Sequence, residues 1–190
     1  PGSYIMFFDS LPDVNTTFII PDALYSTDLF QADIDQITGD ISGHPKNYGA
    51  LPSADTTTDA YIFFKESLWQ TYNQNVGSYN AQFYDVGYIL AMAAEKALME
   101  ASPADMLELR NKVNDYIRIV SHGAAGDPLV TPDMGWTAIK EACEAGGVDY
   151  SGASGDCDID PMGNTETAYS IFKVIKQGND YKFEIIELIP

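Results

Sequence analysis

The sequence predicts an α/β protein, and three observations carry that prediction. Short β-rich segments that end at prolines occupy the first 52 residues, four stretches with helical apolar spacing lie between residues 53 and 147, and two alternating segments close the chain. A short strand that stops at a proline is typical of a buried parallel strand that runs into a loop. Apolar residues that recur every three or four positions indicate amphipathic helices.

The predicted strands lie at the two ends of the chain. Residues 17–20 are β-rich and stop at Pro21, residues 48–51 are closed by Pro52, and the apolar stretch 4–10 breaks at Pro12. Near the C-terminus, residues 169–175 and 181–189 alternate on either side of a turn at 177–180. This pattern predicts a β-hairpin with Phe172 and Val174 on one face.

The first two predicted helices are rich in apolar residues. One follows Thr57–Asp59 and has an apolar residue at every fourth position from Ala60 to Tyr72. The other spans residues 83–101. We expect the first apolar face to be widened by Tyr61, Phe63 and Trp69, and the second to contain Val86, Ile89, Leu90, Ala93, Ala97 and Leu98.

The next two predicted helices have clear starting signals. Ser102 can cap the third helix, with Pro103 in the first turn and Asp105 at the positive end of the helix dipole. The same capping pattern at Thr131–Asp133 predicts the start of a fourth helix, and Gly146 and Gly147 predict its end.

The chain is strongly acidic. Its 190 residues contain 28 Asp and Glu against 10 Lys and Arg, a formal net charge of −18. Such a surface repels phosphate backbones and anionic lipid head groups, so we expect no nucleic-acid partner and no membrane-surface role. No run of about 18 apolar residues predicts a membrane span. The chain begins at Pro1 without a leader, and we expect it to be either a mature N-terminus or an internal fragment.

The two cysteines, Cys143 and Cys157, leave two alternatives open. They lie 14 positions apart on either side of a glycine-rich turn region. In an oxidising compartment this spacing permits a disulfide that would add about 3 kcal/mol by closing a short loop. The alternative is two buried free thiols.

An alternating acidic segment is the strongest candidate for a metal site. Asp156, Asp158 and Asp160 precede Gly163 and Glu166, which suggests a calcium loop. In neither register do the glycine and the glutamate both fall where an EF-hand needs them. The sequence therefore favours a turn in which the Asp side chains accept bonds from nearby N–H groups.

Signals for an enzyme are weak throughout the chain. The segment around Ser154 lacks the spacing of a hydrolase nucleophile elbow, and His44 and His122, the two candidate bases, lie in loops rich in Gly or Pro. No phosphate-binding loop, dinucleotide fingerprint or zinc motif occurs. We therefore expect a protein that is not an enzyme and that carries no cofactor.

Asp22 is the strongest candidate for a ligand-binding residue. It follows the predicted strand 17–20, and ligands collect at the carboxyl ends of strands in open α/β sheets. With Tyr25 beside it, the carboxylate could hold an ammonium group through charge-assisted hydrogen bonds and ring contact. A cap of the following loop or helix is the alternative, and the pattern alone leaves both open.

Three segments carry a resemblance to a known family. The first is GVDYSGASG at residues 147–155 with DIDPMG at 158–163, which fits a "Y-x-G-x-x-G, then D-x-D-x-x-G" pattern; the others are YDVGYILAMAAEKA at 84–97 and IPDALYS at 20–26. Together, and in their order along the chain (20–26, 84–97, 147–163), they resemble the type I periplasmic binding proteins, the leucine/isoleucine/valine-type receptors of ABC importers.

The resemblance implies a fold and a division of the chain. Members have two α/β lobes joined by crossovers, and the solute binds in the cleft between the lobes. The chain resembles the C-terminal half only. Residues 1–52 and 168–190 would belong to the C-terminal lobe, and residues 53–167 would form part of the N-terminal lobe.

The resemblance also implies a site and partners. Asp22 would pair with the α-ammonium of an amino acid, with Tyr25 and Tyr4 as secondary residues of the cleft wall. The partners would be a small polar solute such as an amino acid or amide, an ABC permease, and the missing N-terminal half, in a periplasmic or extracellular location. A ligand-sensing regulatory module of the same fold is the alternative, and a stand-alone calcium-binding domain is a more distant one.

Overall fold

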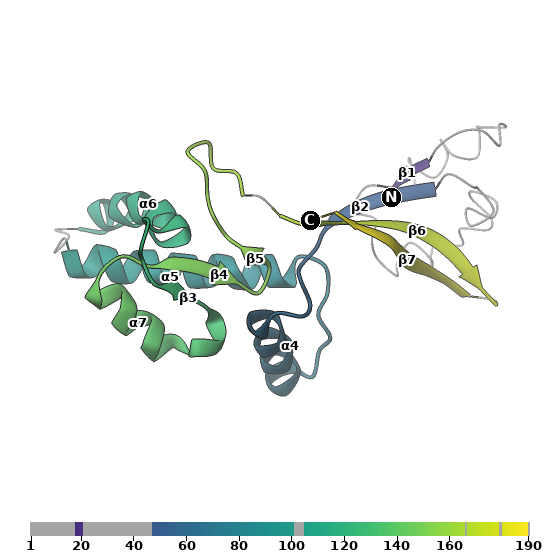
Figure 1. The fold of residues 1–190 in the computed structure, drawn as a ribbon, viewed down its shortest axis with the longest axis horizontal. Coiled ribbons are helices and arrows are strands. Elements are labelled where there is room, and N and C mark those ends of the chain that lie inside the picture. Colours follow the sequence, from purple (N-terminus) through teal and green to yellow (C-terminus); the bar gives the residue numbers. More distant parts are fainter. Residues whose placement is uncertain (1–17, 21–46, 101–104, 166, 179, 190) are drawn as a thin grey trace. The chain divides into compact units, whose positions relative to one another are not determined.

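The chain folds as two compact units. A computed structural model describes residues 18–20, 47–100, 105–165, 167–178 and 180–189 (Figure 1). One unit consists of residues 1–52 and 169–190, and the other of residues 53–168.

The first unit contains a four-stranded sheet with the order β1-β2-β6-β7. β1 (Phe18–Ile20) lies parallel to β2 (Asn47–Pro52), β2 pairs antiparallel with β6 (Tyr169–Gln177), and β6 forms a hairpin with β7 (Asp180–Ile189). The strands predicted at 17–20 and 48–51 and the predicted hairpin are thus confirmed. Phe172 and Val174 are both fully buried, as the alternation predicts.

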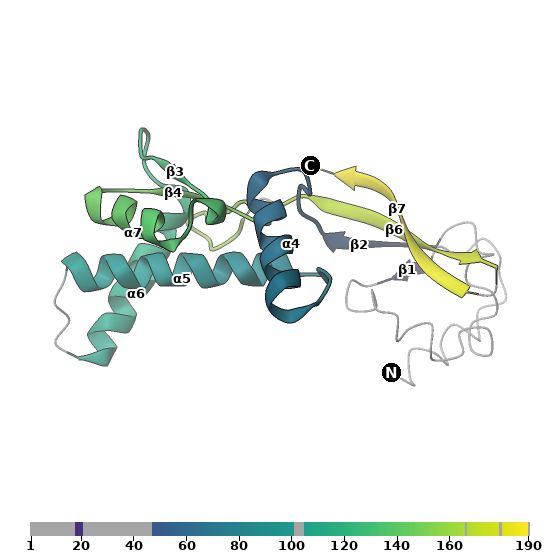
Figure 2. The same ribbon diagram turned by 90° about the horizontal axis from the view of Figure 1, so that it is seen from below.

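The second unit combines four α-helices with a small sheet. The elements are α4 (Asp59–Tyr72), α5 (Asn80–Glu100), α6 (Met106–His122), β3 (Leu129–Val130), the 3-10 turn η3 (Pro132–Met134), α7 (Trp136–Ala145), β4 (Asp149–Gly152) and β5 (Gly155–Asp156). β4 is the middle strand, parallel to β3 and antiparallel to β5. α5 packs against α6 and α7, and β4 runs alongside α5 (Figure 2).

The core of the second unit lies between these helices and β4. It draws residues from α5, α6, β3, α7 and β4 and includes Met92, Val120, Val130, Ile139, Cys143, Val148 and Tyr150. The ring of Tyr150 stacks on Tyr88 at a centroid distance of 5.9 Å. Because helices cover the strand, the most buried aromatic residue of the unit comes from β4.

The helix starts agree with the sequence in part. Thr58 caps α4, where its side chain accepts a hydrogen bond from the N–H of Tyr61 at 3.2 Å. The cap predicted at Ser102 is wrong, because α6 begins at Met106 and is capped by Asp105. The Asp105 carboxylate accepts bonds from the N–H groups of Leu107 and Glu108, both at 2.9 Å.

The predicted apolar faces of α4 and α5 are wider than the faces that the unit buries. On α4, Ala60 and Phe64 are buried, whereas Trp69 and Tyr72 are exposed. On α5, the buried members of the predicted face are Ile89, Ala93 and Ala97, and the exposed members are Val86, Leu90 and Leu98. Among the described helices, none is both long enough and apolar enough to cross a membrane.

Candidate functional site

The residues predicted to bind a ligand lie outside the described part of the chain. These are Asp22, Tyr25 and Tyr4. His44, named above as a candidate base, and Glu166, named with the acidic segment, also lie outside it. Asp22 comes two positions after the end of β1, which pairs in parallel with β2. The prediction that Asp22 meets an ammonium group therefore stays a prediction.

The chain passes between the two units twice, and the two passages are adjacent. β2 ends at Pro52, which is paired with Tyr169 at the start of β6. One step further, the N–H of Ser53 donates to the carbonyl oxygen of Ala168 at 2.8 Å.

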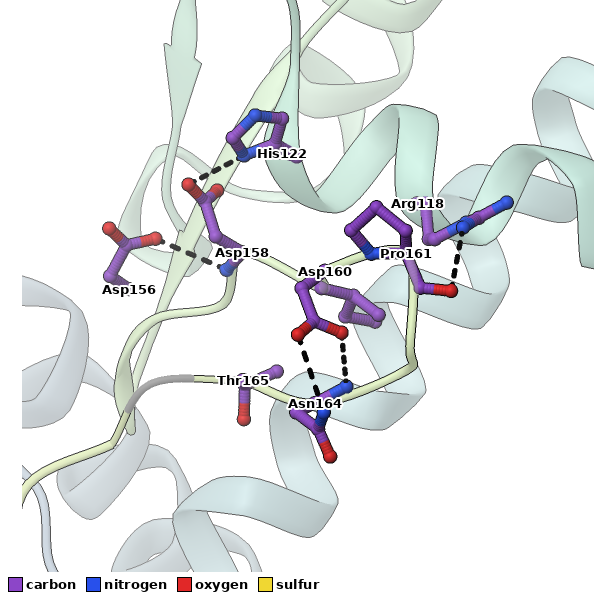
Figure 3. A pocket seen from close by; sticks show the side chains of 9 residues that line it. Arg118, His122, Asp156, Asp158, Asp160, Pro161, Asn164 and Thr165 are labelled. Carbon is purple, nitrogen blue, oxygen red and sulfur yellow. Dashed lines mark hydrogen bonds and ion pairs between the residues drawn. The ribbon is translucent and has the colours of Figure 1, made fainter.

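An acidic pocket opens on the surface of the second unit. Its volume is about 630 Å³, and it lies between the C-terminal part of α6 and the segment 156–165. Figure 3 shows the residues that line it: Arg118, His122, Asp156, Asp158, Ile159, Asp160, Pro161, Asn164 and Thr165.

Asp160 organises the turn at the rim of this pocket. Its Oδ1 accepts bonds from the N–H groups of Met162 and Asn164, both at 2.8 Å, and its own N–H donates to the Asn164 carbonyl oxygen at 2.8 Å. These donors, with the N–H of Asn164 first among them, lower the pKa of the Asp160 carboxyl below its usual value. The Asp160 carboxylate thus accepts hydrogen bonds within its own turn.

The other two aspartates also have local partners. Asp158 pairs with the Nδ1 of His122 at 2.6 Å, and Asp156 accepts a bond from the N–H of Asp158 at 3.2 Å (Figure 3). Arg118 donates to the carbonyl oxygen of Pro161 at 3.3 Å. Over the described residues, no three carboxylate, imidazole or thiol side chains gather as a metal site would require. The side chains of Asp156 and Asp160 thus accept bonds from nearby N–H groups, as in the turn that the sequence favoured.

Asp149 adds a further negative charge beside this pocket. It is the first residue of β4 and packs against the end of α6, where a Cβ at Gly123 would lie 2.7 Å from the Asp149 Cβ. Gly123 also has a φ of 61°, so both space and backbone favour glycine there. Partial burial raises the pKa of the Asp149 carboxyl, and the charges of Asp158 and Asp156 raise it further.

Asp149→Asn is therefore expected to stabilise the protein at pH 7 by about 0.5 kcal/mol. The folded protein disfavours the charged form of the Asp149 carboxyl. The stability gained by Asp149→Asn is therefore fully present at a pH above the raised pKa of the folded state, and it is absent below the ordinary pKa of 3.8. Urea unfolding at low and high salt measures it, and salt should shrink the gain without removing it, since burial is not screened. The control is Asp115→Asn on the exposed side of α6, and a gain of equal size there would contradict the explanation.

A second cluster of polar groups is buried between α5 and the β4–β5 turn. The carboxylate of Asp85, which is only 2% exposed, accepts bonds from the Tyr150 hydroxyl at 2.9 Å and the Ala153 N–H at 2.8 Å. The carboxylate also accepts hydrogen bonds from the Ser154 N–H at 2.6 Å and from the Ser154 hydroxyl at 2.5 Å. We call these residues the Asp85 cluster.

The Asp85 cluster joins two segments that the sequence analysis treated separately. Asp85 lies in the segment 84–97 and its four donors lie in the segment 147–155, so one hydrogen-bonded unit contains two of the three segments that carry the resemblance. The sequence pattern did not predict this role of Asp85. The available signal was a carboxylate among the apolar residues in the first half of α5, since such a group is buried only when it is bonded.

The two cysteines are free and buried in the structure. Of the two alternatives left open by the sequence, the structure therefore has the buried thiols. Burial, followed by the negative charge of Asp85, raises the pKa of Cys157 to about 12, and burial also raises the pKa of Cys143. Both side chains are thus neutral thiols near pH 7.

Comparisons with known proteins extend the description of the fold. No family model and no curated protein sequence matches the chain. Among solved structures, the leucine binding protein LivK from Thermotoga maritima is similar, with a TM-score of 0.53 and 17% sequence identity. The match covers 92% of this chain and 37% of that protein, so the chain spans little more than a third of its length. The chain therefore has the α/β fold of the type I periplasmic binding proteins, in two units that are joined by adjacent crossovers.

Proposed function

We propose that the chain is part of an extracytoplasmic solute-binding protein that delivers an amino acid or a related polar molecule to an ABC importer. The observation that carries the proposal is the structural similarity to the leucine binding protein over 92% of the chain. The adjacent crossings at Pro52–Ser53 and Ala168–Tyr169 support it, because a binding protein that closes on its solute needs a hinge between its lobes.

The proposed hinge divides the chain in a defined way. Residues 1–52 and 168–190 would belong to the C-terminal lobe, and residues 53–167 would form part of the N-terminal lobe. The solute would lie in the cleft between the lobes, and the closed form would dock on the permease. The remaining part of the N-terminal lobe would come from a segment of the same protein that precedes Pro1.

The proposed contact with the solute is made by Asp22. A carboxylate that follows a parallel strand can accept two or three charge-assisted bonds from an α-ammonium group. Tyr25 and Tyr4 would be secondary residues of the cleft wall. The solute carboxylate would then be bound by donors of the preceding segment, so the 190-residue chain alone would bind weakly.

Titration calorimetry of the intact protein against a panel of amino acids, with leucine first, tests this proposal. Asp22→Ala is expected to weaken binding by about 2 kcal/mol, roughly thirtyfold, because an ammonium group loses its charged acceptor in a closed cleft. Asp115→Ala on the exposed side of α6 should leave the affinity unchanged.

Two results would count against the proposal in different ways. If Asp22→Ala binds the same amino acid as tightly as the parent protein, Asp22 is not the ammonium contact and only the residue assignment fails. If the intact protein binds no amino acid or amide in the panel, the proposed class of solute fails.

A further inference from the structure

α5 is apolar around almost its whole circumference. Between Phe83 and Leu98 its charged residues are Asp85, Glu95 and Lys96. Asp85 and Lys96 are buried, and Glu95 pairs with Lys140 of α7 at 2.6 Å. A helix that is hydrophobic all round belongs to the interior of a larger body and not to a solvated surface.

One side of this helix nevertheless has no covering layer among the described residues of the second unit. Its exposed large side chains are Phe83, Val86, Leu90 and Leu98, with exposed fractions of 74%, 50%, 45% and 54%. Gly87 and Ala94 lie on the same side. We call these six residues the α5 stripe.

The α5 stripe also contains a depression that can receive a side chain. Gly87 and Ala91 lie between the aromatic rings of Phe83, Tyr84, Tyr88 and Trp136, around a hollow of about 440 Å³. A Cβ added at Gly87 would have no other atom within 4 Å. Small residues flanked by large rings form the kind of hole into which a neighbouring element inserts a knob.

The sheet of the second unit is too small to cover α5. The helix has 21 residues, whereas β3, β4 and β5 have 2, 4 and 2. At 1.5 Å per residue the helix is about 32 Å long, and a strand of four residues reaches only about 13 Å. In an α/β fold the apolar sides of such a helix are covered by further strands and helices of the same domain.

The comparison with the leucine binding protein indicates that such elements can belong to the rest of a longer protein. Nearly all of this chain matches it, yet 63% of that protein lies outside the match. We propose that the α5 stripe is the surface on which the segment of the same protein that precedes Pro1 packs. This rests on the proposed function only in assuming a longer protein, and not on any solute.

Thiol labelling tests the proposal independently of solute binding. Val86→Cys is expected to react quickly with a maleimide in the 190-residue chain and about a hundredfold more slowly in the intact longer protein, where the stripe is covered. Leu107→Cys on α6, at an exposed apolar position away from the stripe, should react equally in both. Cys143 and Cys157 are buried and supply the unreactive background.

A second variant checks the depression. Gly87→Leu should leave the 190-residue chain as stable as before or slightly more stable, because the added atoms enter open space and glycine is a poor helix former. In the intact protein the same change should lower the melting temperature by several degrees, because the knob that fills the hole is displaced.

Four results would contradict the proposal, and two of them identify another occupant of the stripe. Equal labelling of Val86→Cys in both proteins, or a gene without coding residues before Pro1, overturns the proposal. Protection in the 190-residue chain that is lost on dilution means that a second copy covers the stripe, and protection that is independent of concentration means that the first unit covers it. Either outcome also overturns the proposal, and none of them bears on whether the protein binds an amino acid.

Discussion

Asp85→Ala is expected to lower the free energy of unfolding of the second unit by about 4 kcal/mol. The substitution removes an acceptor of four hydrogen bonds at a position that is 2% exposed. The N–H groups of Ala153 and Ser154 and the Tyr150 hydroxyl would be left in the interior without this partner. Each buried donor that loses its acceptor costs about 1–3 kcal/mol, and a water that enters the space recovers part of that cost.

Chemical denaturation monitored by tryptophan fluorescence measures this loss directly. Both tryptophans of the chain, Trp69 and Trp136, lie in the second unit, so the signal reports on the unit that contains Asp85. Asp85→Asn keeps the size and one acceptor oxygen but turns an amide donor toward other donors, and we expect it to cost about 2 kcal/mol.

The matched control for Asp85→Ala is Asp115→Ala. Both aspartates lie in the interior of a long helix, α5 or α6, so both substitutions gain the same helix propensity. Asp115 is exposed, and its replacement should be neutral or slightly stabilising. If the two variants unfolded at the same denaturant concentration, the Asp85 cluster would contribute nothing to stability.

The sequence predicts the elements of this fold well because their signals are local. The strands that end at Pro21 and Pro52, the hairpin around Gly178, and the helix that follows Thr58 depend on residues within one turn or one strand length of each other. The cap of α6 shows the limit of this reasoning. Ser102 and Asp105 are both good capping residues three positions apart, and the local pattern does not choose between them.

The buried side of α5 could not be predicted for a different reason. Periodicity locates the core side of a helix by contrast between apolar and polar faces, and α5 has little contrast. The sequence therefore grouped Val86 and Leu90 with Ile89 and Ala93, although the structure exposes the first two and buries the others. A helix of this composition indicates that its neighbours lie on more than one side, and this is the basis of the proposal for the α5 stripe.

Whether a site could be predicted also depends on how far apart its residues lie in the sequence. The turn at Asp160 was predictable because its donors lie within four positions. The Asp85 cluster was not, because the Tyr150 hydroxyl comes from 65 positions away and no periodic pattern links the two. The family resemblance marked both segments without indicating that they touch.

Gly152→Ala is expected to destabilise the second unit by about 3 kcal/mol. Gly152 is the last residue of β4, and a Cβ there would overlap the carboxylate of Asp85. That carboxylate cannot move aside easily, because four hydrogen bonds hold it in place. Denaturant unfolding measures the loss, and Gly147→Ala is the control: its Cβ would overlap the partly exposed carboxylate of Asp127, which can turn toward solvent for the loss of one bond from the Ala124 N–H. We expect the control to cost about 1 kcal/mol.

A double-mutant cycle then separates the overlap from any other effect at Gly152. In the Asp85→Ala background the space beside Gly152 is open, so adding Gly152→Ala should cost about 1 kcal/mol instead of about 3, a coupling of about 2 kcal/mol. Gly147→Ala should be additive with Asp85→Ala, since its carboxylate belongs to a different turn. Additive costs for Asp85 and Gly152 would mean that glycine is needed there for the backbone of the β4–β5 turn and not for the approach of Asp85. A coupling of the expected size would explain why the glycine of the Tyr150–Gly155 segment and the aspartate of α5 occur together: the carboxylate can accept its bonds from Ala153 and Ser154 only if the residue before them has no side chain.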